Sequence, residues 1–170
     1  VVEGGRWIAR AASNIEYEVF DLRSIFIGHA QEEHRDFQMI ERDYVSIGGK
    51  LEAIQKADKN IGSEALSAWM FHRAGQTNPF DLLGAMFIVE GLGKRMANIW
   101  GEKIRQQLKL NKAQVSFLLY HGENDENHFQ KLEQVFESGI LSDEIIKKIV
   151  KTAKVTARLY ILQLEELSNC

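Results

Sequence analysis

The sequence contains one cysteine and one proline among 170 residues. The lone Cys170 excludes an internal disulfide, which fits a reducing compartment. No segment approaches the roughly 20 apolar residues of a membrane-spanning helix, and the N-terminus lacks the charged-then-apolar pattern of a secretory signal. We therefore expect a cytoplasmic protein that does not enter a membrane.

An excess of charge of one sign is also missing. The chain has 21 basic and 24 acidic residues, interspersed along the sequence, and its formal net charge is -3. This balance offers no basic surface to nucleic acid, so we expect no nucleic-acid partner. A chain of 170 residues that is 45% hydrophobic predicts one globular domain over residues 1–170. A homodimer is a common state for a small helical bundle and remains open.

Runs of alternating apolar and polar residues are nearly absent, so the sequence has little signal for strands. Together with the single proline, this absence predicts an all-helical chain. Apolar residues at helical spacing predict helices over residues of about 6–12, 14–47, 63–75, 79–108, 112–137 and from 143 onward.

Caps and breakers set the expected helix boundaries. Gly48 and Gly49 should end the long N-terminal helix, as glycine does after a last helical turn. Ser63 is a candidate N-cap, and Asn78 before Pro79 is a cap residue with proline at the first helical position. Interior glycines at 84, 91 and 93 cost about 1 kcal/mol each against alanine, which favours close helix packing there.

His121, Asp125 and His128 form the most distinctive polar pattern in the chain. If this stretch is helical, the three residues stand at i, i+4 and i+7 and share one face. Two imidazoles and a carboxylate suit a first-row transition metal such as iron, manganese or zinc. A solvated face is the alternative, because residues 123–127 are all polar.

Glu90 is a second candidate ligand, because it ends the apolar run of residues 82–89. Burying a lone carboxylate is expensive without a cation or hydrogen-bonding partners. If the helices on either side of residues 109–111 form an antiparallel hairpin, Glu90 comes level with residue 129 or 130. His128 is then the nearest candidate partner, either through a shared metal or through a plain hydrogen bond.

His29, Glu33 and Asp36 repeat the i, i+4, i+7 spacing in the predicted N-terminal helix. Facing helices of a bundle can build a dinuclear metal site from inward carboxylates and histidines, so the two polar faces could meet. Taken alone, this cluster is more typical of a solvent-exposed face. Three neighbours that point elsewhere on the helix are expected at the surface: Glu32, His34 and Arg35.

Glu90 lies in mid-helix, and the motif His121-x3-Asp125-x2-His128 follows after residues 91–120. This combination resembles the haem-oxygenase-like non-haem diiron oxidases and oxygenases, also called iron-containing redox enzymes. The similarity extends from about residue 29 to residue 128. In that family the earlier ligand helix usually supplies Glu-x6-His. The matching positions here hold histidine and then aspartate, which reverses the order and leaves one metal or two as open alternatives.

The resemblance implies an all-α, haem-oxygenase-like bundle of about seven helices, whose first helix could lie outside a sequence that begins at Val1. It also implies two Fe(II) ions per chain, held by the following residues: Glu90, His121, Asp125, His128, His29 and Asp36, with Glu33 as an alternate ligand.

The expected activity also comes from the resemblance. Family members use O2 to desaturate, cleave, decarboxylate or N-oxygenate amino acids and fatty acids, so we expect O2-dependent oxidation of a small substrate of either kind. Alternatives on the same fold are a metal-free enzyme, similar to the thiaminase-type hydrolases or the cofactorless quinone-forming oxidase, and a haem oxygenase that uses His29 or His34. A non-catalytic helical binding protein is the alternative from another class.

Overall fold

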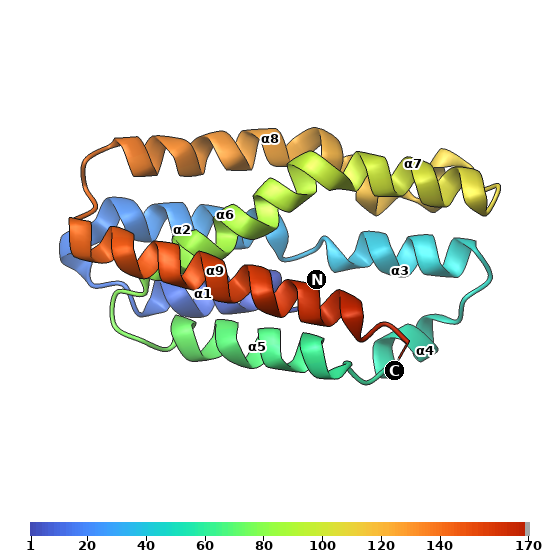
Figure 1. The fold of residues 1–170 in the computed structure, drawn as a ribbon, viewed down its shortest axis with the longest axis horizontal. Helices are drawn as coiled ribbons and strands as arrows, with labels where there is room; N and C mark the ends of the chain where they lie inside the picture. Colours follow the sequence, from blue (N-terminus) through green and yellow to red (C-terminus); the bar gives the residue numbers. More distant parts are fainter. Residues whose placement is uncertain (169–170) are drawn as a thin grey trace.

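The computed structural model describes residues 1–168, apart from the side chains of residues 124–127. Within that range every regular element is helical and no strand occurs, which confirms the all-helical prediction. Most of the helices run along the long axis of the molecule (Figure 1). In the described part of the chain, none of the helices has the length and apolar character needed to cross a bilayer.

The α-helices follow one another along the chain as α1 (Gly4–Ser13), α2 (Phe20–Glu33), α3 (Phe37–Ser46), α4 (Leu51–Lys56), α5 (Ile61–Ala74), α6 (Leu83–Leu92), α7 (Asn98–Gln107), α8 (Ser116–Glu137) and α9 (Asp143–Glu165). Single 3-10 turns occupy Tyr17–Val19, Phe80–Leu82 and Lys112–Gln114, and a π-helical segment, Gly93–Ala97, joins α6 to α7.

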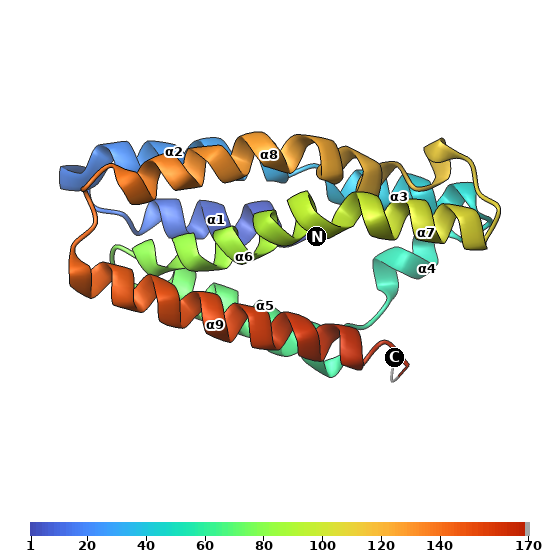
Figure 2. The same ribbon diagram turned by 45° about the horizontal axis from the view of Figure 1, so that its top comes forward.

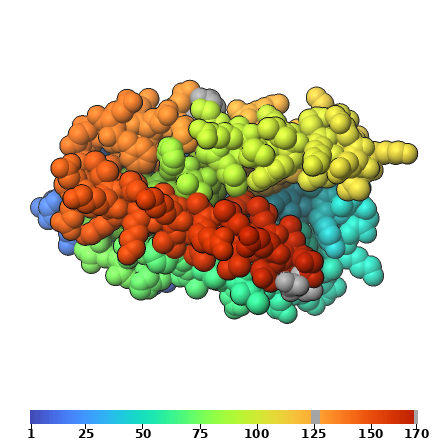
Figure 3. Space-filling model, viewed as in Figure 1, coloured from blue at the N-terminus to red at the C-terminus, as the bar shows by residue number. Residues whose placement is uncertain are grey.

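Two helices lie in the middle of the bundle. α1 packs on α2 and α5, and α6 packs on α8 and α9, so α1 and α6 lie between the α2 and α8 side and the α5 and α9 side (Figure 2). α9 covers one face of the molecule, between the surfaces of α5 and α8 (Figure 3). Fully buried Phe26, Leu83 and Met86 belong to the core that these helices share.

The predicted helix over residues 14–47 is wrong as one continuous element. The chain instead forms α2 and α3, separated by a turn at residues 34–36. At this turn the His34 Nδ1 atom lies 2.7 Å from the Gln31 carbonyl oxygen, so the side chain occupies an acceptor near the end of α2. Gly5 of α1 approaches the His34 backbone so closely that a Cβ on Gly5 would collide with it. The close packing of α1 against this turn therefore helps to fix the place at which the helix breaks.

The predicted helix over residues 79–108 has the expected path but a different start. Pro79 precedes a 3-10 turn, and the regular α6 begins at Leu83. The π-helical segment after α6 widens the helix where a strict α-helix was expected, and such segments are frequent at functional sites. Close packing explains two of the glycines, because a Cβ on Gly84 would collide with the Ile149 carbonyl and one on Gly91 would press on Phe129.

The remaining boundaries differ little from the prediction. Asn60, rather than Ser63, caps α5, since the Asn60 side chain accepts a hydrogen bond from the Ser63 backbone amide. Ser142 caps α9 by the same kind of bond from Ile145. Gly48 has a φ of 95° after the last turn of α3, a conformation that glycine adopts without strain.

Candidate metal centre

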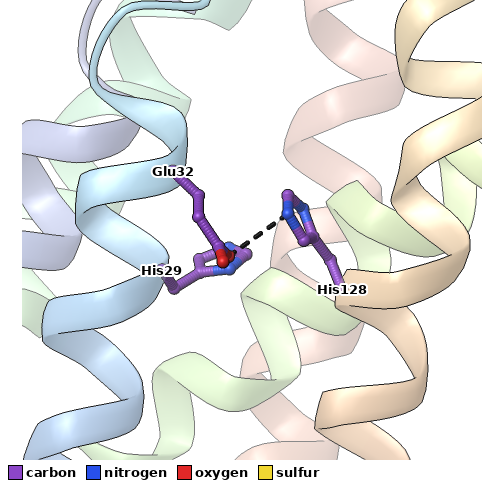
Figure 4. A group of neighbouring side chains, drawn as sticks. All are labelled: His29, Glu32 and His128. Carbon is purple, nitrogen blue, oxygen red and sulfur yellow. Dashed lines mark ion pairs between the residues drawn. The ribbon is translucent and has the colours of Figure 1, made fainter.

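The candidate centre lies among α2, α6 and α8, each of which supplies acidic or imidazole side chains. His29 and Glu33 are one turn apart on α2, Glu90 is on α6, and His128 is on α8. The rings of His29 and His128 approach with centroids 5.2 Å apart, and Figure 4 shows them facing each other from their two helices. The three helices therefore bring residues more than 90 positions apart into one cluster.

Glu90 is the buried carboxylate at the middle of this cluster, with 4% of its surface exposed. Its Oε1 lies 3.0 Å from the His29 Nε2 atom, and its Oε2 lies 3.3 Å from the His128 Nδ1 atom. The predicted proximity of Glu90 and His128 is therefore confirmed. The second partner, His29, lies on α2, which is not part of the predicted hairpin.

Hydrogen bonding keeps Glu90 ionised in spite of its burial. Burial raises the pKa of Glu90, but hydrogen bonds from His128 and His29 outweigh it and lower that pKa to about 2. The same bond to Glu90 raises the pKa of His128 above its ordinary value, against the opposing effect of burial. Without metal, the cluster is thus a carboxylate held between two imidazoles.

The pKa of Glu33 is shifted in the opposite direction to that of Glu90. Burial, followed by the nearby charge of Glu90, raises the pKa of Glu33 to about 7. Its Oε1 atom is buried and accepts no hydrogen bond from the described residues, although it lies 3.5 Å from the His128 Nδ1 atom. A buried carboxylate oxygen without a donor is costly, and a cation beside it would compensate its charge.

Two overlapping sets of side chains have the dimensions of a metal site. In the described part of the chain, ligand atoms of His29, Glu33 and Glu90 lie within 4.8 Å of one another, and so do those of His29, Glu32 and His128. Imidazole nitrogens and carboxylate oxygens together suit iron and similar ions. The donor set and the orphaned oxygen of Glu33 therefore fit a bound transition metal.

Asp36 and His121 form a second pair close to this cluster. The His121 Nε2 atom lies 3.4 Å from the Asp36 Oδ2 atom, and both side chains are largely buried. Both charges act on the pKa of Glu33, Asp36 raising it and His121 lowering it. The polar faces of the N-terminal region and of α8 thus meet as predicted. Asp125, the predicted ligand between the two histidines of α8, lies outside the described side chains.

Glu32 is the contact that sequence reasoning missed. We predicted a surface position, and its side chain is indeed 39% exposed, but its Oε2 lies 3.2 Å from the His128 Nε2 atom. Figure 4 shows this ion pair. Its position three residues after His29 on α2 was an available signal, since residues at i and i+3 are neighbours on a helix. His34 and Arg35 are exposed, as predicted.

Comparisons with known proteins show the family and the fold of the chain. The profile of a family described as iron-containing redox enzymes matches residues 6–161. A crystal structure of a domain of unknown function with a heme oxygenase-like fold, from Shewanella denitrificans OS217, superposes with a TM-score of 0.90 and covers 99% of this chain and 72% of that chain. At 18% identity, this likeness shows the fold alone. None of the curated proteins matches the chain.

Proposed function

Because the chain belongs to the family of iron-containing redox enzymes, we propose that it oxidises a small organic substrate with O2 at a non-haem diiron centre among α2, α6 and α8. The observation on which this proposal rests is the geometry of Glu90, whose two oxygens face imidazoles from two different helices, next to a Glu33 Oε1 atom that accepts no hydrogen bond from the described residues. Glu90 and Glu33 would hold the metal together with these imidazoles.

The ligands of the first ion would come from the closest cluster. His29, Glu33 and Glu90 form one metal-sized set, and His128 lies within 3.3 Å of Glu90 and 3.5 Å of Glu33. Glu33 thereby becomes a central ligand rather than an alternate one. The exposed Glu32 is an additional carboxylate that could reach the same ion from the side of His128.

The second ion would lie toward the Asp36 end of the cluster. Asp36 and His121 already pair there, and Asp125 follows His121 by four residues on α8, which is one helical turn. Glu90 and Glu33 lie between the two ends in this arrangement. Seven ligand side chains would then hold the centre: His29, Glu33, Asp36, Glu90, His121, Asp125 and His128.

Ferrous iron at such a centre supplies the electrons that activate O2, and a set of imidazoles and carboxylates leaves coordination positions open for it. The protein contributes a largely buried cluster, because the side chains of His29, Glu33, Glu90 and His128 are each at most 17% exposed. Glu90 orients both imidazoles through its two oxygens. Because its pKa is raised, Glu33 would give up a proton when a cation binds beside it.

The reaction class follows from the family resemblance. We propose desaturation, C–C cleavage, decarboxylation or N-oxygenation of an amino-acid-like or fatty-acid-like substrate. A haem oxygenase has less support on this site, because its proximal histidine needs an open haem cleft, whereas the candidate His29 is buried against Glu90. The other candidate, His34, is bonded to the Gln31 carbonyl on the opposite side of α2.

Anaerobic reconstitution with Fe2+ tests the centre. The chain has five histidines, of which three lie at the cluster, while His34 and His72 are exposed. A double variant His121→Ala/His128→Ala should lose most of the bound iron, and the matched double variant His34→Ala/His72→Ala should keep it. Iron content unchanged in the first variant would refute the proposed centre, and a Soret band after reconstitution with haem would favour the haem enzyme.

A further inference from the structure

The short helix α3 has little attachment to the core of the bundle. It follows α2 after the turn at residues 34–36, and none of its residues is buried. In the described part of the chain its main neighbours are α4, the start of α8 and the 3-10 turn Lys112–Gln114. Asp36 directly precedes α3, so the position of this proposed iron ligand depends on the contacts that hold α3 in place.

Polar contacts between α3 and the start of α8 follow one another in antiparallel order. At the N-terminal end of α3, Asp36 faces His121, with 3.4 Å between the Oδ2 and Nε2 atoms. At the C-terminal end, the Ser46 carbonyl oxygen accepts a hydrogen bond of 3.0 Å from the Gln114 side chain. Asp43 lies between these two contacts and binds the first turn of α8. The three contacts together fix one register between the two segments.

Asp43 binds the first turn of α8 with both of its carboxylate oxygens. Its Oδ1 accepts a hydrogen bond of 2.6 Å from the Ser116 hydroxyl, and its Oδ2 accepts one of 2.8 Å from the Phe117 backbone amide. Val115, the residue at the N-cap position of α8, makes no capping bond with its side chain. A carboxylate is favoured at a helix N-terminus, because the first amides lack partners within the helix. Asp43 therefore caps α8 from another helix.

Phe117 connects this cap to the candidate metal centre. His121 follows it by four residues on α8, and the two rings approach with centroids 4.3 Å apart. Because Asp43 holds the Phe117 amide, it fixes the turn of α8 that leads to His121. Asp43 also follows Asp36 by seven residues, which is about two helical turns. One carboxylate thus acts on both members of the pair of Asp36 and His121 without belonging to that pair.

We propose that Asp43 is a positioning residue for the second ion of the centre, and that its bonds to α8 hold Asp36 against His121. The inference rests on the proposed function, since Asp36 and His121 are taken as ligands of that ion. Removing a group that orients metal ligands typically lowers metal affinity about 10- to 100-fold. Loss of Asp43 should therefore weaken binding of the second ion by this factor. The first ion, whose proposed ligands lie on α2, α6 and α8, should bind as in wild type.

Three variants dissect the contact of Asp43 with α8. Asp43→Ala removes both bonds, Asp43→Asn keeps one oxygen acceptor but loses the charge, and Ser116→Ala removes only the bond to Oδ1. Asn60→Ala is the matched control, since Asn60 caps α5 through a bond of 2.8 Å from the Ser63 amide and α5 carries no proposed ligand. Asn60→Ala should lower thermal stability without changing iron binding, which separates positioning from general destabilisation.

Anaerobic Fe2+ titration, followed by Mössbauer spectroscopy, observes the two ions separately. Wild type and Asn60→Ala should bind a coupled pair of ions. Asp43→Ala should bind the first ion with wild-type affinity and the second about 10- to 100-fold more weakly, while Asp43→Asn and Ser116→Ala should lie between these limits. A second ion bound by Asp43→Ala with wild-type affinity would refute the positioning role. Equal weakening of both ions, or the same loss in Asn60→Ala, would also overturn it.

Hydrogen exchange of the metal-free protein examines the same contact without iron. Because α3 buries no residue, its amides should exchange about tenfold faster in Asp43→Ala, as expected for loss of a hydrogen bond to a charged group. They should exchange at the wild-type rate in Asn60→Ala. Wild type that binds no iron would refute the proposed function, and this inference with it. A normal iron pair in wild type, together with unchanged exchange of α3 in Asp43→Ala, would refute the role of Asp43 alone.

Discussion

Glu90 on α6 and His128 on α8 meet with the Oε2 and Nδ1 atoms 3.3 Å apart. The other oxygen of Glu90 faces His29 on α2, so one carboxylate connects three helices at the centre of the bundle. This connection makes Glu90 both a structural group in the metal-free chain and the central proposed ligand of the loaded one. Its two roles can be separated by experiment.

Replacing Glu90 with glutamine should abolish most iron binding, because an amide is a weak ligand for Fe2+ compared with a carboxylate. The metal-free variant should also lose about 1.5–3 kcal/mol of unfolding free energy, as expected for hydrogen bonds to a charged group. Iron analysis and urea unfolding measure the two effects. Glu64→Gln on the exposed surface of α5 should change neither, and iron binding retained by Glu90→Gln would contradict the assignment.

The contact between Glu90 and His128 could be predicted from the sequence because α6 and α7 follow one nearly continuous path and α8 packs back along both of them after the turn at residues 109–111. Counting residues from that turn placed the two side chains at the same level. The break between α2 and α3 could not be predicted in this way. Neither proline nor glycine marks residues 34–36, and the apolar spacing continues through them.

Glu32 shows a second limit of sequence reasoning. A helical wheel assigns it to the solvent side of α2, and it is in fact partly exposed. Its contacts come from Lys131 and His128, about 100 residues later in the chain. The spacing of Glu32 from His29 places it beside the cluster, but only the packing of α8 beside α2 supplies Lys131 and His128 as its partners.

Iron binding should become weaker as the pH falls below about 7, because Glu33, with a pKa raised to about 7 by burial and the charge of Glu90, must release its proton to the solvent when a metal binds. Each proton released changes the apparent affinity up to about tenfold per pH unit. Fe2+ or Mn2+ titrations between about pH 6 and 8 measure this slope. An affinity that does not change over this range would contradict the placement of Glu33 in the centre.

The contribution of Glu33 to the stability of the metal-free protein should fall as the pH rises from 4.5 through 7. Its folded-state pKa is raised to about 7 from an ordinary 4.5, so the native chain binds this proton more tightly than the unfolded chain does. Glu33→Gln removes this penalty. Relative to wild type, the variant should gain about 1–3 kcal/mol of unfolding free energy at about pH 8 compared with about pH 5.

Glu90 gives the opposite pH dependence, at lower pH. Its pKa is lowered to about 2, so its contribution to stability is present above 4.5 and is lost as the pH falls toward 2. Urea unfolding curves of Glu33→Gln and of the Glu64→Gln control at about pH 5 and 8 therefore report on Glu33, because both values lie above the range in which the contribution of Glu90 changes. A pH-independent difference between Glu33→Gln and wild type would contradict the raised pKa.

Replacing Asp36 with asparagine should remove one iron and keep the other. Asp36 pairs with His121 at one end of the cluster, whereas the set of His29, Glu33 and Glu90 does not include it. The iron content should therefore fall to about half of the wild-type value, and Mössbauer spectra should change from a coupled pair to an isolated high-spin ion. Complete loss of iron would mean that the two ends form one cooperative site, and unchanged iron would exclude Asp36.

Replacing glycine with alanine should have opposite effects on the free energy of unfolding at two helical positions, Gly84 and Gly28. A Cβ on Gly84 of α6 would collide with the Ile149 carbonyl of α9, so Gly84→Ala must push these helices apart and should cost about 1–3 kcal/mol, as overpacking does. A Cβ on Gly28 of α2 meets no atom within 4 Å, so Gly28→Ala should gain about 0.4–1 kcal/mol from the lower entropy of the unfolded chain. Thermal unfolding measures both, and equal shifts of the two variants would contradict the close contact of α6 with α9. Because α6 also positions Glu90, Gly84→Ala should weaken iron binding as well, whereas Gly28→Ala should leave it unchanged.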